Sequence, residues 1–271
     1  MRLHELFCSV VLAAALSGTS SFADTLRAGG IGASAAMLPP LFAAFDSNSE
    51  HTLEVIPALG SSGGLRAAAD GVLDIAMSGR PLKDEEKAQG LLDSYAVRTP
   101  FLLVTSRANP QGQKSAEISD IYLSPKASWP DGLPIRIILR PLSDSDTPAL
   151  QAMFPNMVAA LEAAHKRREV PVAATDQDNA NLAEKITGSF TTSTLTQIQM
   201  ERRQLHIIPI DGVEPSLANL DRGTYPYSKT LHFVLTRKSS PIAKRFIAFL
   251  MTPEGRSALA ATGNLPVGAT P

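Results

Sequence analysis

Three polar loops in this sequence carry groups that could hold a small anion. Residues 60–64 read Gly-Ser-Ser-Gly-Gly and run directly into a segment that is expected to be helical. The first N–H groups of a helix have no partner inside it, and the helix dipole favours negative charge there. Residues 29–34 are also rich in glycine, which lets a backbone approach a ligand closely. Residues 140–147 add the Arg140 guanidinium and several hydroxyls, so the three loops together predict an anion site.

Each loop also has a purely structural explanation. Serine is favoured at helix starts, so residues 60–64 could be only an N-cap with flexible glycines. Residues 140–147 could likewise be the capping turn of a helix that begins near Pro148. A nucleotide is not expected, because residues 29–34 lack the third spaced glycine of a dinucleotide fingerprint and residues 60–64 lack the lysine of a P-loop. We therefore expect no cofactor.

The loops lie in a chain whose segments alternate between strand and helix. Strands are expected over residues 25–29, 53–58 and 73–77, and helices over residues 35–45 and in the segment that the turn over residues 60–64 opens. This alternation predicts an α/β fold. Each candidate loop follows a strand, which is where ligands bind in open α/β sheets. Later strands are expected over 101–105, 135–139, 206–210 and 231–236, and later helices from about Ala149 to residues 166–168 and over 242–251.

Residues 1–23 have the features of a secretory signal peptide. A basic residue precedes an apolar run over residues 6–16, and residues 21–23 form a small-residue cleavage pattern. The run is shorter than the roughly 20 residues that a membrane-spanning helix needs. We therefore expect export, with cleavage before Asp24. The only cysteine, Cys8, would leave with the signal, so disulfide and thiolate chemistry is not expected in the mature chain.

Charge and histidine placement argue against several classes of partner. The formal net charge is −1, and nothing in that balance suggests nucleic acid or a membrane surface. The basic run at residues 166–168 is expected to be a solvated helix end, where cations complement the helix dipole. His51, His165, His206 and His232 are scattered without the spacing of a metal site. We expect neither a metal nor a nucleic-acid partner.

Several segments together resemble a known family in their order and spacing. Residues 30–34 read Gly-Ile-Gly-Ala-Ser, and residues 74–81 read Asp-Ile-Ala-Met-Ser-Gly-Arg-Pro. Together with residues 60–64 and 140–147, these segments resemble the phosphate-binding periplasmic proteins of ABC importers, which are type II solute-binding proteins. In that family the segment like residues 30–34 reads Gly-x-Gly-Ala-Thr, and the one like residues 74–81 reads Asp-Phe-Gly-Ala-Ser-Asp. The segment like residues 60–64 reads Gly-Ser-Ser-Gly-Gly, and the one like residues 140–147 reads Arg…Ser-Gly-Thr. Further landmarks that resemble this family are residues 120–123, Trp129 and residues 246–255.

The resemblance implies a two-lobed α/β fold in which the chain crosses twice between the lobes and the ligand lies in the cleft. It divides the chain into a signal peptide (1–23), a first lobe (24–105), a second lobe (106–225) and the completion of the first lobe (226–271). It implies a non-enzymatic periplasmic protein that captures inorganic phosphate or a related oxyanion for the inner-membrane permease of an ABC importer. We expect a monomer.

The resemblance also implies which residues bind the ligand. Ser34 and Ser61 would donate hydrogen bonds from one side of the cleft. Arg140, Ser145 and Thr147 would donate from the other side, with the guanidinium replacing part of the water shell of the anion. Further candidate ligand-binding residues in the same segments are Ser62, Ser78, Ser143 and Arg80, whose charge either turns toward the cleft or points to solvent.

The sequence departs from the family at the position that distinguishes phosphate from sulfate. There the family has a carboxylate that accepts the proton remaining on phosphate, and Gly79 stands at the matching position here. The loop over residues 140–147 is also one residue longer, and Asp146 stands where the family has glycine. An ionised carboxylate repels an anion unless it accepts a proton, so we expect either that Asp144 or Asp146 replaces the missing acceptor or that the ligand has changed.

Two alternative functions stay open at this stage. Residues 144–147 read Asp-Ser-Asp-Thr, which superficially fits a haloacid-dehalogenase-like phosphotransferase with Asp144 as nucleophile and Asp146 as acid/base beside magnesium. The pair lies several residues beyond its expected strand, which argues against that enzyme. A binding protein with a changed ligand, or one that presents its ligand to a membrane sensor, would have the same sequence features.

Overall fold

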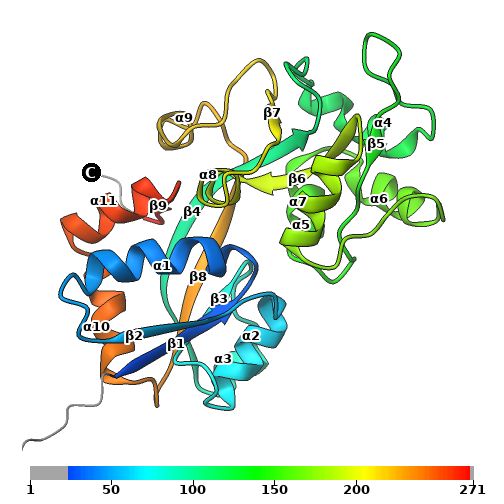
Figure 1. Ribbon diagram of the computed structural model, residues 1–271. Coiled ribbons are helices and arrows are strands. Elements are labelled where there is room, and N and C mark those ends of the chain that lie inside the picture. Colours follow the sequence, from blue (N-terminus) through cyan, green and yellow to red (C-terminus); the bar gives the residue numbers. More distant parts are fainter. Residues whose placement is uncertain (1–23, 269–271) are drawn as a thin grey trace, which may run out of the picture.

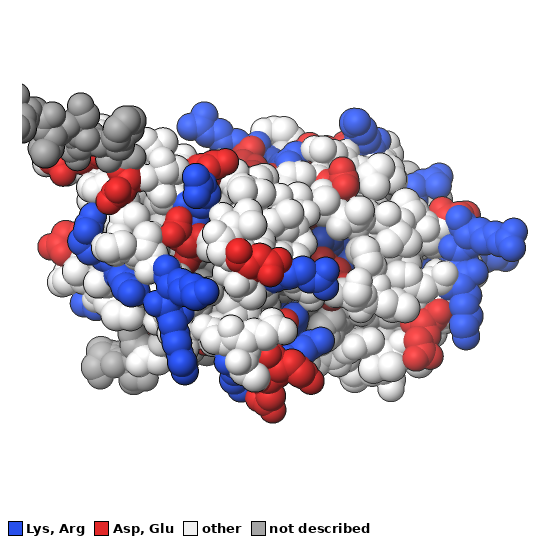
Figure 2. Space-filling model, turned by 90° about the horizontal axis from the view of Figure 1, so that it is seen from below, with Lys and Arg blue, Asp and Glu red and all other residues white. Residues whose placement is uncertain are grey.

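The computed structural model describes residues 24–268 of the chain. The predicted signal peptide and Cys8 lie outside the described residues, so the structure says nothing about them. Within residues 24–268, no helix combines the length and the apolar character that crossing a membrane requires. On the face shown in Figure 2, basic and acidic side chains are interspersed over most of the surface, as the small net charge predicts.

The described strands form one mixed sheet, and the predicted α/β class is confirmed. Its path runs β2-β1-β3-β8-β4-β6-β5, with β7 and β9 pairing to β4. β1 lies parallel to β2 and β3, whereas β8 is antiparallel to both β3 and β4. The bounds are β1 Thr25–Gly30, β2 Thr52–Ile56, β3 Ile75–Ser78, β4 Leu91–Thr105, β5 Arg136–Ile137, β6 Ser189–Thr194, β7 His206–Ile208, β8 Ser228–Thr236 and β9 Leu265–Pro266.

The molecule has two lobes, each with its own apolar core, joined by the long strands β4 and β8 (Figure 1). Val97 packs in the core of the first lobe and Phe101, four positions later on β4, packs in the core of the second. On the return path, Tyr225 belongs to the second core and Leu231 to the first. The lobe boundaries expected at residues 105–106 and 225–226 stay a prediction.

Helices cover the sheet of the first lobe on both sides, and aromatic side chains fill the space between them. Phe45 at the end of α1 packs edge-on against Phe246 of α10, with ring centroids 5.5 Å apart. The start of α10 is fixed by the Ser240 hydroxyl, which caps the helix, and by Pro241 at its first position. The bounds are α1 Ala33–Phe45, α2 Gly60–Ala69, α3 Asp84–Ala88, α10 Pro241–Leu250 and α11 Pro253–Ala261.

The second lobe is built around Phe190 of β6. Tyr122 and Trp129 pack against this ring, with centroid distances of 5.9 and 6.3 Å, and all three side chains are buried. The helical bounds are η1 Ser115–Glu117, α4 Ile118–Leu123, α5 Asp146–Met153, α6 Met157–His165, α7 Asp176–Lys185, α8 Leu195–Met200 and α9 Leu217–Asp221.

One expectation about the helices was wrong. The single helix expected from about Ala149 to residues 166–168 is two helices, because Pro155 cannot continue the first and Asn156 adopts a left-handed φ of 58°. The basic run follows the end of α6, and Arg167 there donates hydrogen bonds to backbone oxygens of the second lobe. The helix that residues 60–64 were expected to open is confirmed, and these residues form the first turn of α2.

Strand lengths also differed from expectation. β4 begins at Leu91, ten residues before the expected start, because the mixed polar and apolar segment before Phe101 pairs with β8 along its whole length. The strand expected over residues 135–139 is shorter: β5 has two residues, and Leu139 makes an isolated bridge to Val172.

Candidate functional site

A small cavity of about 40 Å³ lies between the two lobes, where the three candidate loops meet. This volume holds only a few water-sized occupants, so any ligand of this closed arrangement must be small. The first lobe contributes Ile31, Gly32, Ala58, Gly60 and Ser61 to its wall. The second lobe contributes Arg140, Asp144, Ser145, Ala174, Thr175 and Asp176, and β8 contributes Lys229.

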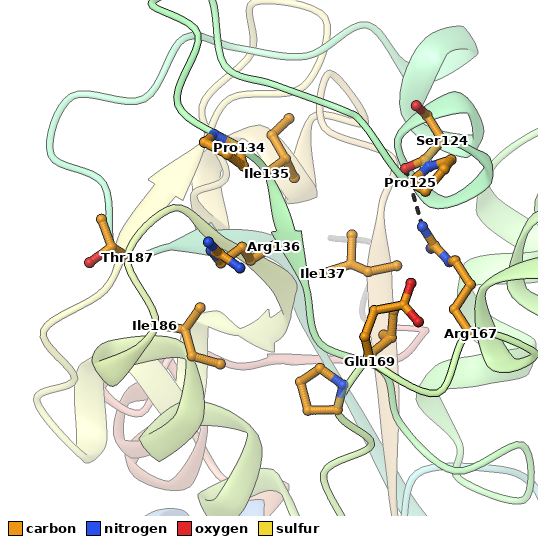
Figure 3. A pocket seen from close by; sticks show the side chains of 12 residues that line it. Ser124, Pro125, Pro134, Ile135, Arg136, Ile137, Arg167, Glu169, Ile186 and Thr187 are labelled. Atoms are coloured by element: carbon orange, nitrogen blue, oxygen red, sulfur yellow. Dashed lines mark hydrogen bonds between the residues drawn. The ribbon is translucent and has the colours of Figure 1, made fainter.

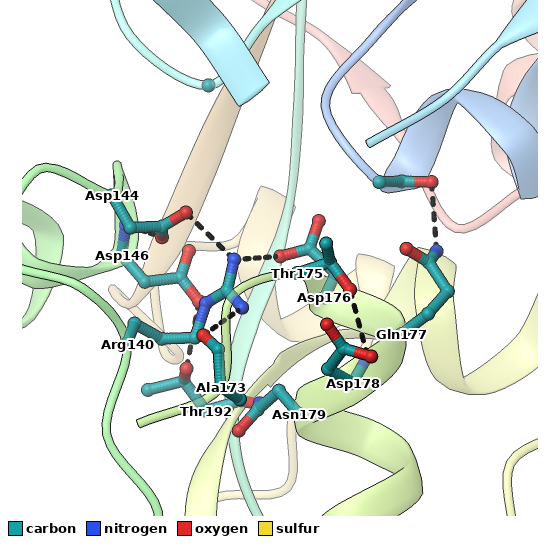
Figure 4. Close-up of polar contacts among 12 residues, drawn as sticks. Arg140, Asp144, Asp146, Ala173, Thr175, Asp176, Gln177, Asp178, Asn179 and Thr192 are labelled. Carbon is teal, nitrogen blue, oxygen red and sulfur yellow. Dashed lines mark hydrogen bonds and ion pairs between the residues drawn. The ribbon is translucent and has the colours of Figure 1, made fainter. Parts of the chain in front are cut away.

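Arg140 is the central cation of this cavity (Figure 4). It follows β5, and its side chain is only 5 % exposed. Nη1 donates to the backbone oxygen of Ala173 at 2.9 Å, while Nη2 donates to Asp144 at 2.8 Å and to Asp176 at 2.9 Å. Within the described residues its buried Nε has no hydrogen-bond partner. The guanidinium therefore retains a donor that a ligand or a water molecule could use.

Asp146 and Lys229 form a second, fully buried ion pair beside the cavity. Lys229 Nζ donates to Asp146 Oδ1, and Thr192 donates its hydroxyl to Oδ2 at 2.8 Å. Burial alone would raise the pKa of Asp146, but Lys229 and Arg140 hold that pKa below its ordinary value. Burial would lower the pKa of Lys229, and the carboxylates around it raise that pKa instead. Both groups are therefore ionised at neutral pH.

Asp176 is the first residue of α7 and lies against the first lobe. Its Oδ1 accepts from Arg140, and a Cβ placed on Gly32 would lie only 2.4 Å from its Oδ2. The next residue, Gln177, donates from Nε2 to the backbone oxygen of Gly32 at 3.2 Å. Burial raises the pKa of Asp176, although the attraction of Lys229 and Arg140 opposes this rise. The start of α7 thus brings a carboxylate with a raised pKa to the boundary between the lobes.

A sequence family described as the PBP superfamily domain matches residues 16–254. The chain belongs to the PBP superfamily. Its resemblance to type II solute-binding proteins is thereby confirmed, together with the two-lobed fold that this resemblance implied. No curated protein matches the chain in sequence.

Solved structures of other PBP-like proteins share the fold. One is from Clostridium perfringens, described as a phosphate ABC transporter substrate-binding protein with bound phosphate; it is 20% identical, with a TM-score of 0.74 over 90% of this chain and 100% of that one. An ABC-type phosphate transport receptor from Vibrio cholerae is 17% identical, with a TM-score of 0.59 over 89% and 99%. The periplasmic molybdate-binding protein of Azotobacter vinelandii is 12% identical, with a TM-score of 0.60 over 89% and 98%. Likeness at these identities establishes the fold.

Three of the predicted ligand-binding residues lie in the wall of the cavity: Ser61, Arg140 and Ser145. The Ser61 hydroxyl accepts a hydrogen bond from the backbone N–H of Gly79 at 3.0 Å. Its own proton remains free to be donated. The structure thus brings together Ser61 from the first turn of α2 with Arg140 and Ser145 from residues 140–147, which we call the arginine loop.

The other predicted residues do not line this cavity. Ser34, Ser78 and Thr147 donate their hydroxyls to nearby backbone oxygens and so stabilise the turns in which they lie. Arg80 is held by Glu86 at 2.7 Å and donates to Ser62 on the surface of the first lobe. Ser143 is exposed. Ligand-binding roles for these residues stay predictions.

The space next to Gly79 of this PBP-superfamily chain is filled by two side chains. A Cβ on Gly79 would lie 2.6 Å from the Ser145 hydroxyl and 2.9 Å from Lys229 Cε. Lys229 and Ser145 therefore occupy the space that a side chain would need. Asp144 accepts from Arg140 and from the backbone N–H of Asp146, so both of its oxygens already have donors, as do both oxygens of Asp146.

Two charged residues of the site, Asp176 and Lys229, were missed by the sequence analysis. Asp176 follows Thr175 in a segment with no assigned element, although threonine followed by acidic residues is a common helix start. Lys229 is a single lysine near the start of a strand in which polar and apolar residues are mixed, and this gives no clear signal of burial. Nothing in their spacing relates either residue to Arg140.

A larger hollow of about 650 Å³ lies elsewhere on the second lobe (Figure 3). Prolines and isoleucines form much of its wall, together with Arg136, Arg167 and Glu169. Arg167 is committed to the backbone oxygens of Tyr122 and Ser124. This hollow does not adjoin the first lobe, so we assign the candidate site to the cavity between the lobes.

Proposed function

We propose that this chain is a periplasmic solute-binding protein that captures phosphate or a related small oxyanion for an ABC importer. The observation that carries the proposal is the buried Arg140 guanidinium in the cavity between the lobes, with the Ser61 and Ser145 hydroxyls in the same wall. α2 begins at Gly60 in that wall, and the N–H groups of its first turn have no partner inside the helix. Such a set of neutral and charged donors suits an oxyanion.

The class of ligand follows from the size of the cavity and from the structural relatives. A volume of about 40 Å³ suits a small anion better than a nucleotide or a sugar. The relative from Clostridium perfringens is described with bound phosphate, and the one from Azotobacter vinelandii as molybdate-binding. These support an oxyanion as the ligand class, with phosphate as the first ligand to test.

The two-lobed architecture supports capture by closure. The ligand would enter between the lobes and be enclosed as they approach, a movement that excludes water from the charged contacts. The predicted signal peptide over residues 1–23 supports export to the periplasm, and the family resemblance supports a monomer that delivers its ligand to a permease. A sensory role, in which the loaded protein contacts a membrane sensor, would use the same cavity.

The phosphotransferase alternative finds little support in the site. It needs Asp144 as a free nucleophile, but Asp144 accepts from Arg140 and from the backbone N–H of Asp146. Its acid/base partner, Asp146, is paired with Lys229. If the alternative were correct, purified protein would release phosphate from an aryl phosphate with magnesium, and Asp144→Asn would abolish the release.

Isothermal titration of the mature protein with phosphate, sulfate, molybdate and a phosphonate tests the proposal. We expect Arg140→Ala to weaken binding of the preferred anion by at least about 2 kcal/mol, because a buried charge-assisted contact is lost. Arg136→Ala is the matched control, because this arginine is exposed and lies outside the cavity wall. Wild-type affinity in the Arg140→Ala variant would mean that the arginine loop only caps a helix.

A further inference from the structure

The position of Asp176 is unusual for a site that receives an anion. Its carboxylate lies between the Arg140 guanidinium of the second lobe and the Gly32 turn of the first lobe (Figure 4). That is the place where the glycine loops and the arginine loop were expected to enclose a ligand. A carboxylate is itself a small oxyanion, with two oxygens that accept hydrogen bonds.

Asp176 makes the contact with Arg140 that an oxyanion in this cavity would be expected to make, and it also packs against the first lobe. Oδ1 accepts from Arg140 Nη2 at 2.9 Å. Oδ2 lies so close to Gly32 that a Cβ there would be 2.4 Å away, so only a glycine allows this approach. Gln177 fixes the same contact by donating to the Gly32 backbone oxygen at 3.2 Å. The start of α7 therefore contacts residues 29–34 of the first lobe, and the Asp176 carboxylate lies at this contact.

The charge balance of the site also opposes a second anion. Arg140 and Lys229 face three carboxylates, of Asp144, Asp146 and Asp176, so the carboxylates outnumber the cations when all are ionised. Asp146 is committed to Lys229, and Asp144 is held by Arg140 and by a backbone N–H. Among these three carboxylates, and within the described residues, Asp176 is the one whose second oxygen accepts no hydrogen bond, and it lies at the boundary between the lobes. Its removal would free the Arg140 Nη2 donor on the side of the cavity that faces the first lobe.

We propose that Asp176 is a built-in counter-anion, whose carboxylate occupies the ligand position at Arg140 and must be displaced or protonated before an external oxyanion binds. The inference rests on the proposed oxyanion-binding function and identifies the residue that sets the affinity of that site. Asp176 then allows the lobes to close without ligand, and it selects for anions that compete well with a carboxylate for a guanidinium.

A different role for Asp176 is conceivable on the same geometry and makes the opposite prediction. If its carboxylate accepted a proton from a bound hydrogen phosphate, it would be part of the ligand site, and removing its charge would weaken phosphate binding. As a counter-anion it competes with the ligand, so removing its charge strengthens binding. The Asp176→Asn variant distinguishes the two roles, because the amide keeps the shape of the side chain and loses the charge.

The experiment titrates wild type, Asp176→Asn and Asp178→Asn with phosphate, sulfate and molybdate at pH 7.5. Asp178 is the matched control, because it lies in the same first helical turn, is exposed and does not line the cavity. We expect Asp176→Asn to bind at least about tenfold tighter than wild type, and Asp178→Asn to bind as wild type does. Unchanged or weaker binding by Asp176→Asn, with a wild type that binds, would overturn the inference alone. Absence of binding to every anion by all three proteins would overturn the proposed function and the inference with it.

The pH dependence of the same comparison gives a second readout. Burial raises the pKa of Asp176, so acidification neutralises this carboxylate earlier than an exposed one. We expect the affinity ratio of Asp176→Asn to wild type to fall as the pH is lowered from 7.5 and the Asp176 carboxylate becomes protonated, and the ratio cancels the ionisation of the ligand. A ratio that stays constant would contradict the inference. The charged groups around Asp176 are Arg140, Asp144, Asp146, Lys229, Asp178 on its own helix and Glu201 beyond Gln177.

Discussion

Gln177 Nε2 donates a hydrogen bond to the backbone oxygen of Gly32, and this bond joins the start of α7 in the second lobe to the start of α1 in the first lobe. It is accompanied by the approach of Asp176 Oδ2 to the same glycine. The lobes therefore meet at a point where one residue has no side chain, which makes the closed arrangement sensitive to a single methyl group.

Gly32→Ala is expected to prevent the lobes from closing to this extent. The new Cβ would lie 2.4 Å from Asp176 Oδ2 and 2.7 Å from Asp176 Cβ, so α7 must move away. Small-angle X-ray scattering should show a larger radius of gyration than for wild type. Adding Asp176→Gly removes the clashing atoms and should restore compaction. If Gly32→Ala alone were as compact as wild type, the contact would not limit closure.

Lys229→Met is expected to destabilise the fold by about 3 kcal/mol. The substitution leaves the Asp146 carboxylate buried without its cation, and breaking a buried ion pair in this way costs more than the pair itself contributes. Urea denaturation measures the loss. The double variant Lys229→Met with Asp146→Leu should recover most of it, because no buried charge remains unpaired. Equal stability of the single variant and wild type would mean that water reaches Asp146.

The two carboxylates should affect stability with opposite dependence on pH. The pKa of Asp146 is lowered in the folded state, so its contribution is present above its ordinary value of 3.8 and is lost as the pH falls below it. The pKa of Asp176 is raised, so its contribution is full below 3.8 and is lost as the pH rises through the folded-state value. In urea denaturation, Asp176→Asn should gain free energy of unfolding relative to wild type between pH 4 and pH 7.

An Asp146→Asn variant provides the complementary measurement. It should lose stability relative to wild type at pH 7, and the difference should shrink on acidification toward pH 3. If the difference in free energy of unfolding between Asp146→Asn and wild type grew on acidification, the pKa of Asp146 would be raised in the folded state rather than lowered.

Gly79→Asp, which restores the acid of the resembled family, should not produce a better phosphate site by itself. Its Cβ would collide with the Ser145 hydroxyl at 2.6 Å and with Lys229 Cε at 2.9 Å. We expect a lower melting temperature and weaker phosphate binding. Lys229→Ala in the same chain removes the contact with Lys229 Cε but leaves Asp146 without its cation. Gly79→Asp combined with Lys229→Ala and Asp146→Asn is therefore the fair comparison. A single variant as stable as wild type would show that Lys229 can move aside.

The parts of the fold that the sequence predicted well are those with strong local signals. β1, α1 and α10 lie within a few residues of their expected positions, because each combines an apolar pattern with a glycine, serine or proline boundary. The first half of β4 was not predicted, because its apolar and polar residues are mixed and its pairing with β8 is distant in sequence. The break before α6 was overlooked although Pro155 marks it.

The candidate site was predictable in part for the same reason. The arginine loop and the glycine-serine turn are compact motifs, and Arg140, Ser61 and Ser145 do line one cavity. Asp176 and Lys229 come from other elements, and only the folded chain brings them to Arg140. Short motifs were therefore enough to predict the hydrogen-bond donors of the site. Asp176 and Lys229, the charged groups beside these donors, could be recognised only from the tertiary structure.

The pairing of β4 with β8 determines what kind of motion can separate the lobes. Thr99 of β4 pairs with Lys229 of β8 close to where both strands pass from one core to the other. The lobes are therefore connected by a hydrogen-bonded pair of strands, and we expect any rotation of one lobe against the other to twist this pair. Lys229 lies on one of these two strands, so we expect its ion pair with Asp146 to resist separation of the lobes.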